Sequence, residues 1–351
     1  MKNESALLAQ GYSFCRQRNM PSNWGHIVNF TKDGSFPEFW LWPNGLRKLE
    51  SCLSSSASKT IISAEDFFFL NPQAIADLSD TLQRHFSKIT IVIYLRRQDK
   101  LALSHKAQSG RTPQSAVVFG TELRPLPTIT PEVRHYLDFH QRIMDWQIIF
   151  TGADFIIRDY DATVSKRGDI AKDIYEAIGV DDRNFLEVGR VNESIQRNAV
   201  YLSLLLRQSG VSQADIKKLW KNGFISNTGG KLKASRSEST AFLRAFDEEN
   251  ERLAMLPGGV TFSDDVVEDV DSEEQAESFE EYFLKASPAL LGSFINQASV
   301  ANGMALADAA EIVIKKHPFA ASKILKVARQ LNPGGTRISR LMDQLGSSDS
   351  A

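Results

Sequence analysis

Cysteine is nearly absent from this sequence, which has Cys15 and Cys52 in a chain of 351 residues. Two cysteines make no disulfide framework and no closely spaced metal-binding pair, so the expectation is a reducing, cytoplasmic environment. No cluster of His, Cys or carboxylate residues has metal-ligand spacing, and no metal is expected. No apolar run approaches the roughly 20 residues of a membrane span, and the first residues lack the apolar core of a signal peptide.

The sequence also has little net charge. Its formal charge of -2, with 42% hydrophobic and 24% charged residues, is typical of an ordinary soluble protein. This balance argues against a nucleic-acid binder that relies on bulk attraction to phosphates. Any anion-binding site must therefore be local.

Short apolar strands alternate with helices in the first half of the chain. Strands are expected at 59–63, 89–95 and 154–158, and helices at 72–82, 99–108, 132–147 and 167–178. The run 89–95 (ITIVIYL) is unbroken and rich in β-branched residues, which predicts burial on both faces, as in a parallel sheet covered by helices. The alternation predicts an α/β class.

Helices dominate from about residue 196. The segment 264–281 carries many Asp and Glu residues and no Lys or Arg, which indicates a solvated linker over 264–285. Residues 286–345 are expected to form a small helical appendage, available to a protein partner. Its spacing faintly resembles a tetratricopeptide unit, but one unit cannot form a solenoid. The predicted domain before the linker is 1–263.

An aromatic-rich segment, PEFWLWP at 37–43, is bounded by prolines. Its rings either line a pocket or fill the core, and aromatic side chains are more often core. The sequence leaves both interpretations open.

The strand ends are where ligand-binding residues are expected. In open parallel sheets, ligands bind outside the carboxyl ends of the strands, near the N-termini of helices. Arg96 follows the strand at 89–95, and Ser104 lies on the next helix. An arginine fork and a hydroxyl in these positions can hold one phosphate group. The alternative is that Arg96 or Arg97 pairs with Asp99, the expected N-cap, while Ser104 has no ligand.

The segment 94–104, YLRRQDKLALS, resembles the 3′-phosphate-binding motif of the sulfotransferase family. That family transfers a sulfuryl group from 3′-phosphoadenosine 5′-phosphosulfate (PAPS) to hydroxyl or amine acceptors. The resemblance matches Arg96 and Ser104 to the motif's arginine and serine, while Arg97-Gln98 replaces its usual Asn-Pro. It implies a P-loop NTPase-like fold, PAPS as donor, a hydroxylated acceptor such as a carbohydrate, and no metal.

Other segments are similar to the bacterial branch of the family, in the same order along the chain. They include 3–12, 61–65, 168–179, 191–194 and 250–262, and the resemblance covers roughly 1–265.

The family's first strand and its lysine loop, of the form K-T-G-T-T, have no counterpart in this sequence, and no G-x-x-x-x-G-K-[ST] loop occurs. That loop holds the 5′-phosphosulfate and stabilises charge on the leaving oxygen. Omitting a central strand leaves its neighbours with unpaired backbone groups, at about 1–3 kcal/mol each. The favoured explanation is an N-terminal truncation, and the alternative is a remnant with a rearranged sheet or a partner strand.

Sulfuryl transfer needs a general base beside the acceptor. The resemblance implies Glu65, after the strand at 59–63, or His26. The alternatives are that Glu65 caps a helix and that His26 is an ordinary surface or core residue. Two functions follow: a PAPS-dependent sulfotransferase, or a non-catalytic relative that binds a 3′-phosphonucleotide or a protein partner. A kinase is disfavoured because no Walker-type lysine loop is present.

Overall fold

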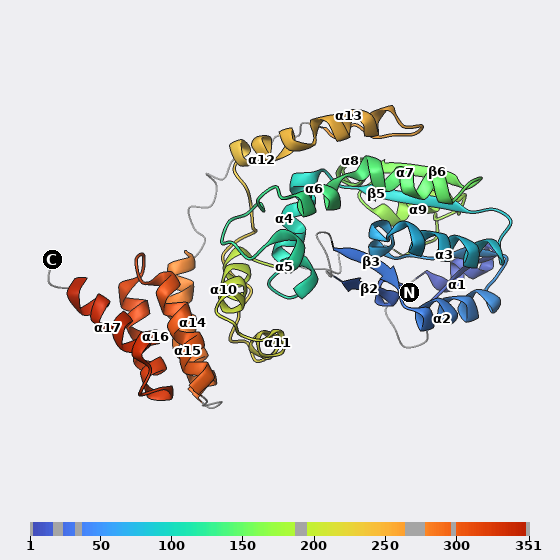
Figure 1. Cartoon of the computed structure of the whole chain (residues 1–351). Coiled ribbons are helices and arrows are strands. Elements are labelled where there is room, and N and C mark those ends of the chain that lie inside the picture. The colour runs from blue at the N-terminus through green and yellow to red at the C-terminus, as the bar shows by residue number, and fades with distance from the viewer. Residues whose placement is uncertain are drawn as a thin grey trace. The chain divides into compact units, whose positions relative to one another are not determined.

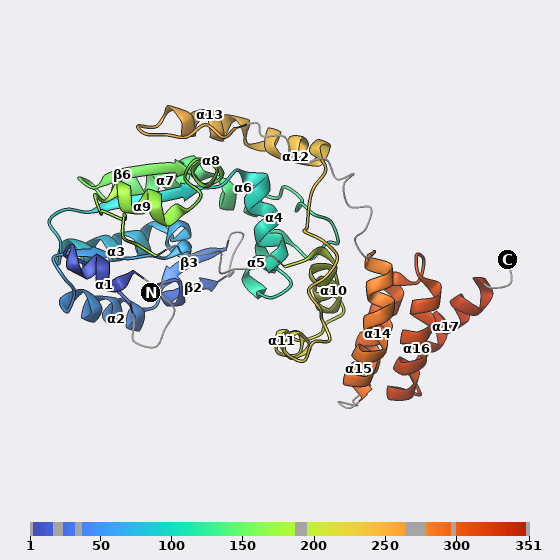
Figure 2. The same cartoon turned by 180° about the vertical axis from the view of Figure 1, so that it is seen from behind.

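The computed structural model describes residues 3–16, 24–31, 37–186, 195–263, 278–295 and 300–348. Its contacts divide the chain into two compact units, which are described separately (Figures 1 and 2). Unit 1 comprises 1–101, 129–193 and 240–266, and unit 2 comprises 102–128, 194–239 and 267–351. No helix within the described ranges is both long and apolar enough to cross a membrane.

The described residues of unit 1 include six strands in three two-stranded sheets. Strand β1 (Tyr12–Phe14) pairs in parallel with β4 (Lys59–Ile61), and β5 (Thr90–Leu95) pairs in parallel with β6 (Asp154–Asp159). Strands β2 (Val28–Thr31) and β3 (Glu38–Leu41) form an antiparallel hairpin. The mixed α/β class predicted from the sequence is confirmed, and so are the strands expected at 59–63, 89–95 and 154–158.

The parallel strands do not form one continuous sheet among the described residues. Strand β4 has a partner strand on one side, β1, and strand β5 has one partner, β6. With a single neighbour each, these strands are less buried than their apolar sequences predict: Ile91 and Val92 are half-buried, while Ile93 and Leu95 are buried. The expected burial of the whole 89–95 run on both faces is therefore wrong.

Helices cover the strands of unit 1. They are α1 (Glu4–Ala9), α2 (Pro43–Ser54), α3 (Pro72–Gln83), α6 (Pro131–Leu137), α7 (Phe139–Ile149), α8 (Tyr160–Arg167), α9 (Ile170–Ala177) and α13 (Asp247–Met255), with short 3-10 turns η1 (Gly25–Ile27), η2 (Glu65–Phe69) and η3 (Arg244–Phe246). Helix α12 (Arg236–Leu243) crosses the boundary between the units.

Local signals explain where these helices begin and end. Asn71 caps α3 by accepting a hydrogen bond from the N–H of Ala74 at 2.9 Å. Asp138 interrupts the single helix predicted at 132–147 because its carboxylate caps α7, accepting from the N–H of Gln141 at 3.0 Å. Gly168, with φ of 75°, ends α8, so the helix predicted at 167–178 begins later than predicted, at Ile170 of α9.

A buried arginine holds the core of unit 1 together. The guanidinium of Arg142 donates to three backbone carbonyls: Nε to Tyr136 at 3.0 Å, Nη1 to Phe69 at 3.4 Å and Nη2 to His135 at 3.2 Å. It also lies over the stacked rings of Phe69 and Tyr136, at 5.1 and 5.6 Å from their centroids. Burial lowers the pKa of Arg142 to about 10, which leaves it charged at neutral pH.

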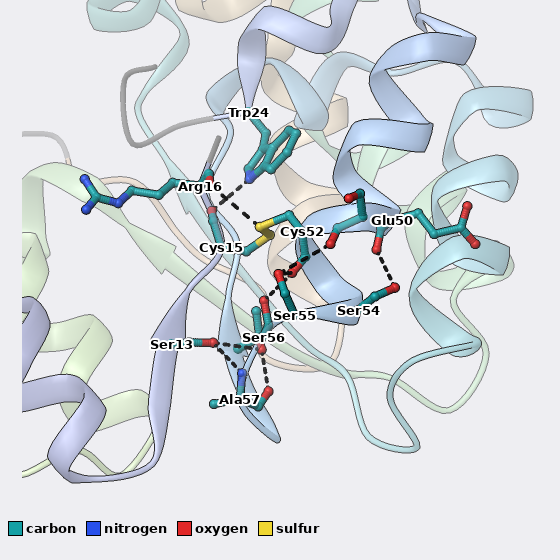
Figure 3. The surroundings of a disulfide bond; sticks show 12 residues. Ser13, Cys15, Arg16, Trp24, Glu50, Cys52, Ser54, Ser55, Ser56 and Ala57 are labelled. Carbon is teal, nitrogen blue, oxygen red and sulfur yellow. Dashed lines mark hydrogen bonds between the residues drawn. A yellow bond between two sulfur atoms is a disulfide. The ribbon is translucent and has the colours of Figure 1, made fainter. Parts of the chain in front are cut away.

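Cys15 and Cys52 form a disulfide that joins the end of β1 to α2 (Figure 3). Cys15 is fixed by its backbone as well, because its N–H donates to Ile61 at 2.9 Å and its carbonyl accepts from the indole of Trp24 at 2.8 Å. This bond corrects the expectation that the cysteines provide no disulfide. The cysteines are 37 residues apart, and it is the fold of unit 1 that brings them together.

Unit 2 is helical. It contains most of α4 (Gln98–Gln108), α5 (Pro113–Phe119), α10 (Arg197–Gln208), α11 (Gln213–Lys221), α14 (Phe279–Ile295), α15 (Val300–Val313), α16 (Pro318–Leu331) and α17 (Thr336–Ser348). The apolar faces of α10, α11 and α14–α17 share one core. Helix α14 begins inside the predicted linker at 264–285. The first part of that linker, 264–277, lies outside the described residues. The predicted domain boundaries therefore stay a prediction.

A buried lysine fixes the end of α5 in unit 2. Lys106 has no exposed surface, and its Nζ donates to the carbonyls of Phe119 at 3.0 Å and Gly120 at 3.1 Å and pairs with Glu122 at 3.2 Å. The last carbonyls of a helix have no hydrogen-bond donor within the helix, and Lys106 donates to two of them at the end of α5. Burial lowers the pKa of Lys106.

Candidate functional site

Arg96 lies directly after β5, opposite the start of α8. The register pairs Leu95 with Asp159, so Arg96 faces the residues that follow β6. Its Nε is 3.3 Å from a carboxylate oxygen of Asp161, and its guanidinium lies 5.6 Å from the ring centroid of Tyr160. The Arg96 side chain remains 38% exposed, which leaves part of its N–H fork accessible.

Lys100 reaches the same carboxylate from the first turn of α4. Its Nζ is 3.2 Å from Asp161, so two cations share one anion. We call Arg96, Lys100, Tyr160 and Asp161 the Arg96 cluster; its charged groups sum to one excess positive charge. Lys100 was not predicted from the sequence, although it lies four residues after Arg96.

Arg97 has a structural role. Its side chain is buried and donates to both carboxylate oxygens of Asp99, at 2.8 and 3.0 Å, and to the carbonyl of Ser263 at 2.9 Å. Asp99 is therefore a partner of Arg97 within the first turn of α4, and its predicted role as the N-cap is wrong. Gln98 starts the helix and hydrogen-bonds Asn250 at 2.6 Å. These contacts fix the start of α4 and hence the position of Lys100.

Ser104 lies on α4 and is half-buried. The division between the two units falls within this helix, between Leu101 and Ala102, so Ser104 belongs to unit 2 and Arg96 to unit 1. The predicted pairing of Arg96 and Ser104 on one phosphate stays a prediction.

The two candidate bases lie on adjoining segments of unit 1. The N–H of Trp24 donates to the carbonyl of Ser63 at 2.7 Å, which joins the segment before His26 to the segment before Glu65. The ring of Trp24 stacks on His26 with centroids 5.3 Å apart. His26 and Glu65 are both exposed, as general bases that must reach an acceptor need to be.

Asp66 is a third candidate that sequence reasoning missed. Desolvation, and then the neighbouring charge of Glu65, raise the pKa of Asp66 above its ordinary value, while the residue as a whole is exposed to solvent. A carboxyl with a raised pKa is better suited to proton transfer near neutral pH. Ala64 occupies the N-cap position of η2, so the alternative that Glu65 caps this turn is wrong.

A polar pocket of about 330 Å³ lies along α8 and α9 beside β6. Asp173 is one of its lining residues; it accepts from the Tyr94 hydroxyl at 2.6 Å and pairs with Arg158 at 3.6 Å and Arg167 at 3.5 Å. The burial of Tyr94 and its hydrogen bond to Asp173 raise the pKa of that tyrosine. Two of the cations that line this pocket, Arg158 and Arg167, are therefore already paired with carboxylates.

Comparison with known proteins gives little beyond this geometry. No protein-family model matches the chain, and no solved structure matches it. One curated relative, named only as an uncharacterized protein of Archaeoglobus fulgidus, is 29% identical over 121 residues. That match covers 34% of this chain and 30% of the relative. The fold and the site therefore define a mixed α/β protein with a local cationic cluster, and its activity is a matter for proposal.

Proposed function

We propose that unit 1 binds a nucleotide by its 3′-phosphate at the Arg96 cluster, as part of a PAPS-dependent sulfotransferase-like protein. The observation that carries this proposal is the partly exposed Arg96 at the carboxyl end of β5, sharing Asp161 with Lys100. A phosphate can displace that carboxylate because it offers more acceptor oxygens and more charge to the same two cations. The sequence motif adds Ser104 as a second ligand.

The reaction we propose moves a sulfuryl group between two oxygens. The acceptor hydroxyl attacks the sulfur of PAPS in line, the bond between sulfur and the bridging oxygen breaks, and adenosine 3′,5′-bisphosphate leaves. The acceptor's proton passes to a base, for which Glu65 and His26 are the predicted candidates, and Asp66 is added because its pKa is raised. The acceptor is a hydroxylated molecule such as a carbohydrate.

The same proposal includes a P-loop-like sheet in unit 1. It also places the protein in the cytoplasm. Two of the two-stranded sheets of unit 1, β1–β4 and β5–β6, are parallel, and β4 and β5 each have one partner strand among the described residues. A sheet that lacks its central strand would have this arrangement. Arg96 follows β5 and Glu65 lies after β4, so the proposed phosphate site and base come from strands of the two parallel sheets.

The second candidate function is nucleotide binding without catalysis. The observation that favours it is the absence of any K-T-G-T-T loop from the 351 residues. Without that lysine, charge on the leaving oxygen is not stabilised, so binding at the 3′ end would not be followed by rapid transfer.

Replacing Arg96 with alanine is expected to weaken binding of adenosine 3′,5′-bisphosphate at least tenfold, because a charge-assisted hydrogen bond contributes roughly 1.5–3 kcal/mol. Isothermal titration calorimetry measures this change. Arg84→Ala is the matched control, since Arg84 is an exposed arginine of the same unit, paired with Glu50. Equal affinities for the Arg96→Ala variant and the unaltered protein would refute the phosphate site.

The 351-residue chain is expected to transfer little or no sulfuryl group from labelled PAPS to hydroxylated acceptors, because it lacks the lysine loop. Release of labelled product, followed over hours at saturating PAPS, is the measurement. Binding without turnover supports the second candidate function for this chain. Robust turnover would show that another cation replaces the lysine.

A further inference from the structure

The hairpin β2–β3 has one face that packs on the core and one that does not. Phe39 is buried, and its ring lies 5.2 Å from Phe30, 5.7 Å from Phe69 and 6.0 Å from Tyr136. Because side chains alternate along a strand, Trp40 points to the opposite face from Phe39. The outward face of such a hairpin is ordinarily polar, so a tryptophan there requires another explanation than core packing.

Trp40 shares that face with a second tryptophan. The ring centroids of Trp40 and Trp42 are 5.5 Å apart with an interplanar angle of 37°, and Trp42 is 48% exposed. The pair therefore forms one continuous aromatic surface, which we call the Trp40–Trp42 surface. This outcome resolves the alternative left open for segment 37–43: Phe39 belongs to the core, and the tryptophans do not.

The backbone under this surface is fixed. The N–H of Trp42 donates to the carbonyl of Ile27 at 3.0 Å, and its own carbonyl accepts from Leu46 in α2 at 3.0 Å. Trp40 is paired with Asn29 across the hairpin, and cross-strand partners have side chains on the same face. A rigid aromatic pair with an amide beside it is preorganised for binding, since little conformational freedom remains to be lost.

We propose that the Trp40–Trp42 surface binds a neutral carbohydrate. The C–H face of a pyranose ring is apolar and stacks on an indole, while its hydroxyls need donors and acceptors at the rim, such as the Asn29 amide. Among the described residues of the hairpin, 28–31 and 38–41, the one charged side chain is Glu38. A negative rim disfavours sulfated or carboxylated sugars, which is why the ligand is a neutral one.

The surface adjoins the candidate base. Ile27, whose carbonyl accepts from the N–H of Trp42, directly follows His26, and the ring of Trp24 stacks on that of His26. A sugar on the Trp40–Trp42 surface thus lies next to the segment that carries a proposed general base. In this respect the inference rests on the proposed function, because the surface would be its acceptor subsite; sugar binding itself does not require that function.

The test is calorimetric titration with neutral tetrasaccharides of glucose, xylose and N-acetylglucosamine. We expect at least one of them to bind, and the Trp42→Ala and Trp40→Ala variants to lose at least tenfold in affinity. Trp146→Phe, at a buried tryptophan of α7, is the matched control and should leave the affinity unchanged. If none of these sugars binds at millimolar concentration, or if both alanine variants bind as the unaltered protein does, the inference is overturned.

Two further measurements separate the possible failures. Trp42→Phe keeps an aromatic ring and should retain most of the affinity. Bound sugar should also protect the exposed tryptophans of the unaltered protein from iodide quenching. The test therefore does not depend on one variant folding.

Arg96→Ala should leave sugar binding intact, and Trp42→Ala should leave nucleotide binding intact. Sugar binding without nucleotide binding would reject the proposed function alone. Loss of self-association in Trp42→Ala, with no sugar bound, would assign the surface to a protein contact and overturn the inference.

Discussion

Replacing Arg142 with methionine is expected to lower the free energy of unfolding of unit 1 by about 3–5 kcal/mol. Methionine fills a similar volume, but it leaves the carbonyls of Phe69, His135 and Tyr136 buried without their donor. Removing one partner of a buried charged contact typically costs this much, because the remaining polar groups stay desolvated. At roughly 2–4 °C for each kcal/mol, the melting temperature should fall by about 10 °C.

Circular dichroism during thermal and urea unfolding measures this loss. Arg84→Met is the matched control, because the Arg84 side chain is 60% exposed, and a substitution there should change stability by less than about 0.5 kcal/mol. If Arg142→Met were as stable as the control, the three hydrogen bonds would not be contributing to the stability of the core.

The second large effect is an acid sensitivity of unit 2 centred on His105. Burial lowers the pKa of His105 from 6.5 to about 4, and its ring packs 5.4 Å from that of Phe119. As the pH falls below 6.5, the unfolded chain takes up a proton at this position before the folded chain does, so unfolding becomes more favourable. The effect grows until about pH 4, where the folded state also binds the proton, and amounts to roughly 3 kcal/mol.

The variant His105→Gln has no titrating side chain at position 105. Its stability should therefore change less between pH 6.5 and 4 than that of the unaltered protein. Denaturant unfolding at half-unit pH steps provides the comparison. His140→Gln, in α7 of unit 1, is the control, and it should keep the pH dependence of unit 2. Parallel curves for His105→Gln and the unaltered protein would show that His105 is not the source of the effect.

Strands β4, β5 and β6 were predictable from their apolar runs, whereas β1 was not predicted. The run at 89–95 is long and rich in β-branched residues, and Asn71-Pro72 signals the start of α3. The hairpin β2–β3 was not predictable, because VNFT and EFWL alternate over four residues each and their aromatic side chains suit a core equally well. The alternation alone could not tell which of the neighbouring rings Phe39 and Trp40 would be buried.

The candidate site was predictable in part, for a related reason. Arg96 and Arg97 are adjacent in the sequence, and their position after the strand could not decide which side chain would be buried. In the structure, Asp99 pairs with Arg97, and Asp161 pairs with Arg96. Asp161 carried no sequence signal, because its place beside Arg96 depends on the register between β5 and β6. Long-range pairing of this kind cannot be read from local patterns.

The disulfide has a consequence for all of these residues. The bond between Cys15 and Cys52 closes a covalent ring in the chain, and that ring contains His26, Asn29 and the Trp40–Trp42 surface. Closing such a ring removes many of the extended conformations that the segment would otherwise adopt when it opens locally. The candidate base and the proposed sugar surface therefore share one tether, and a reducing agent in the buffer would act on both at once.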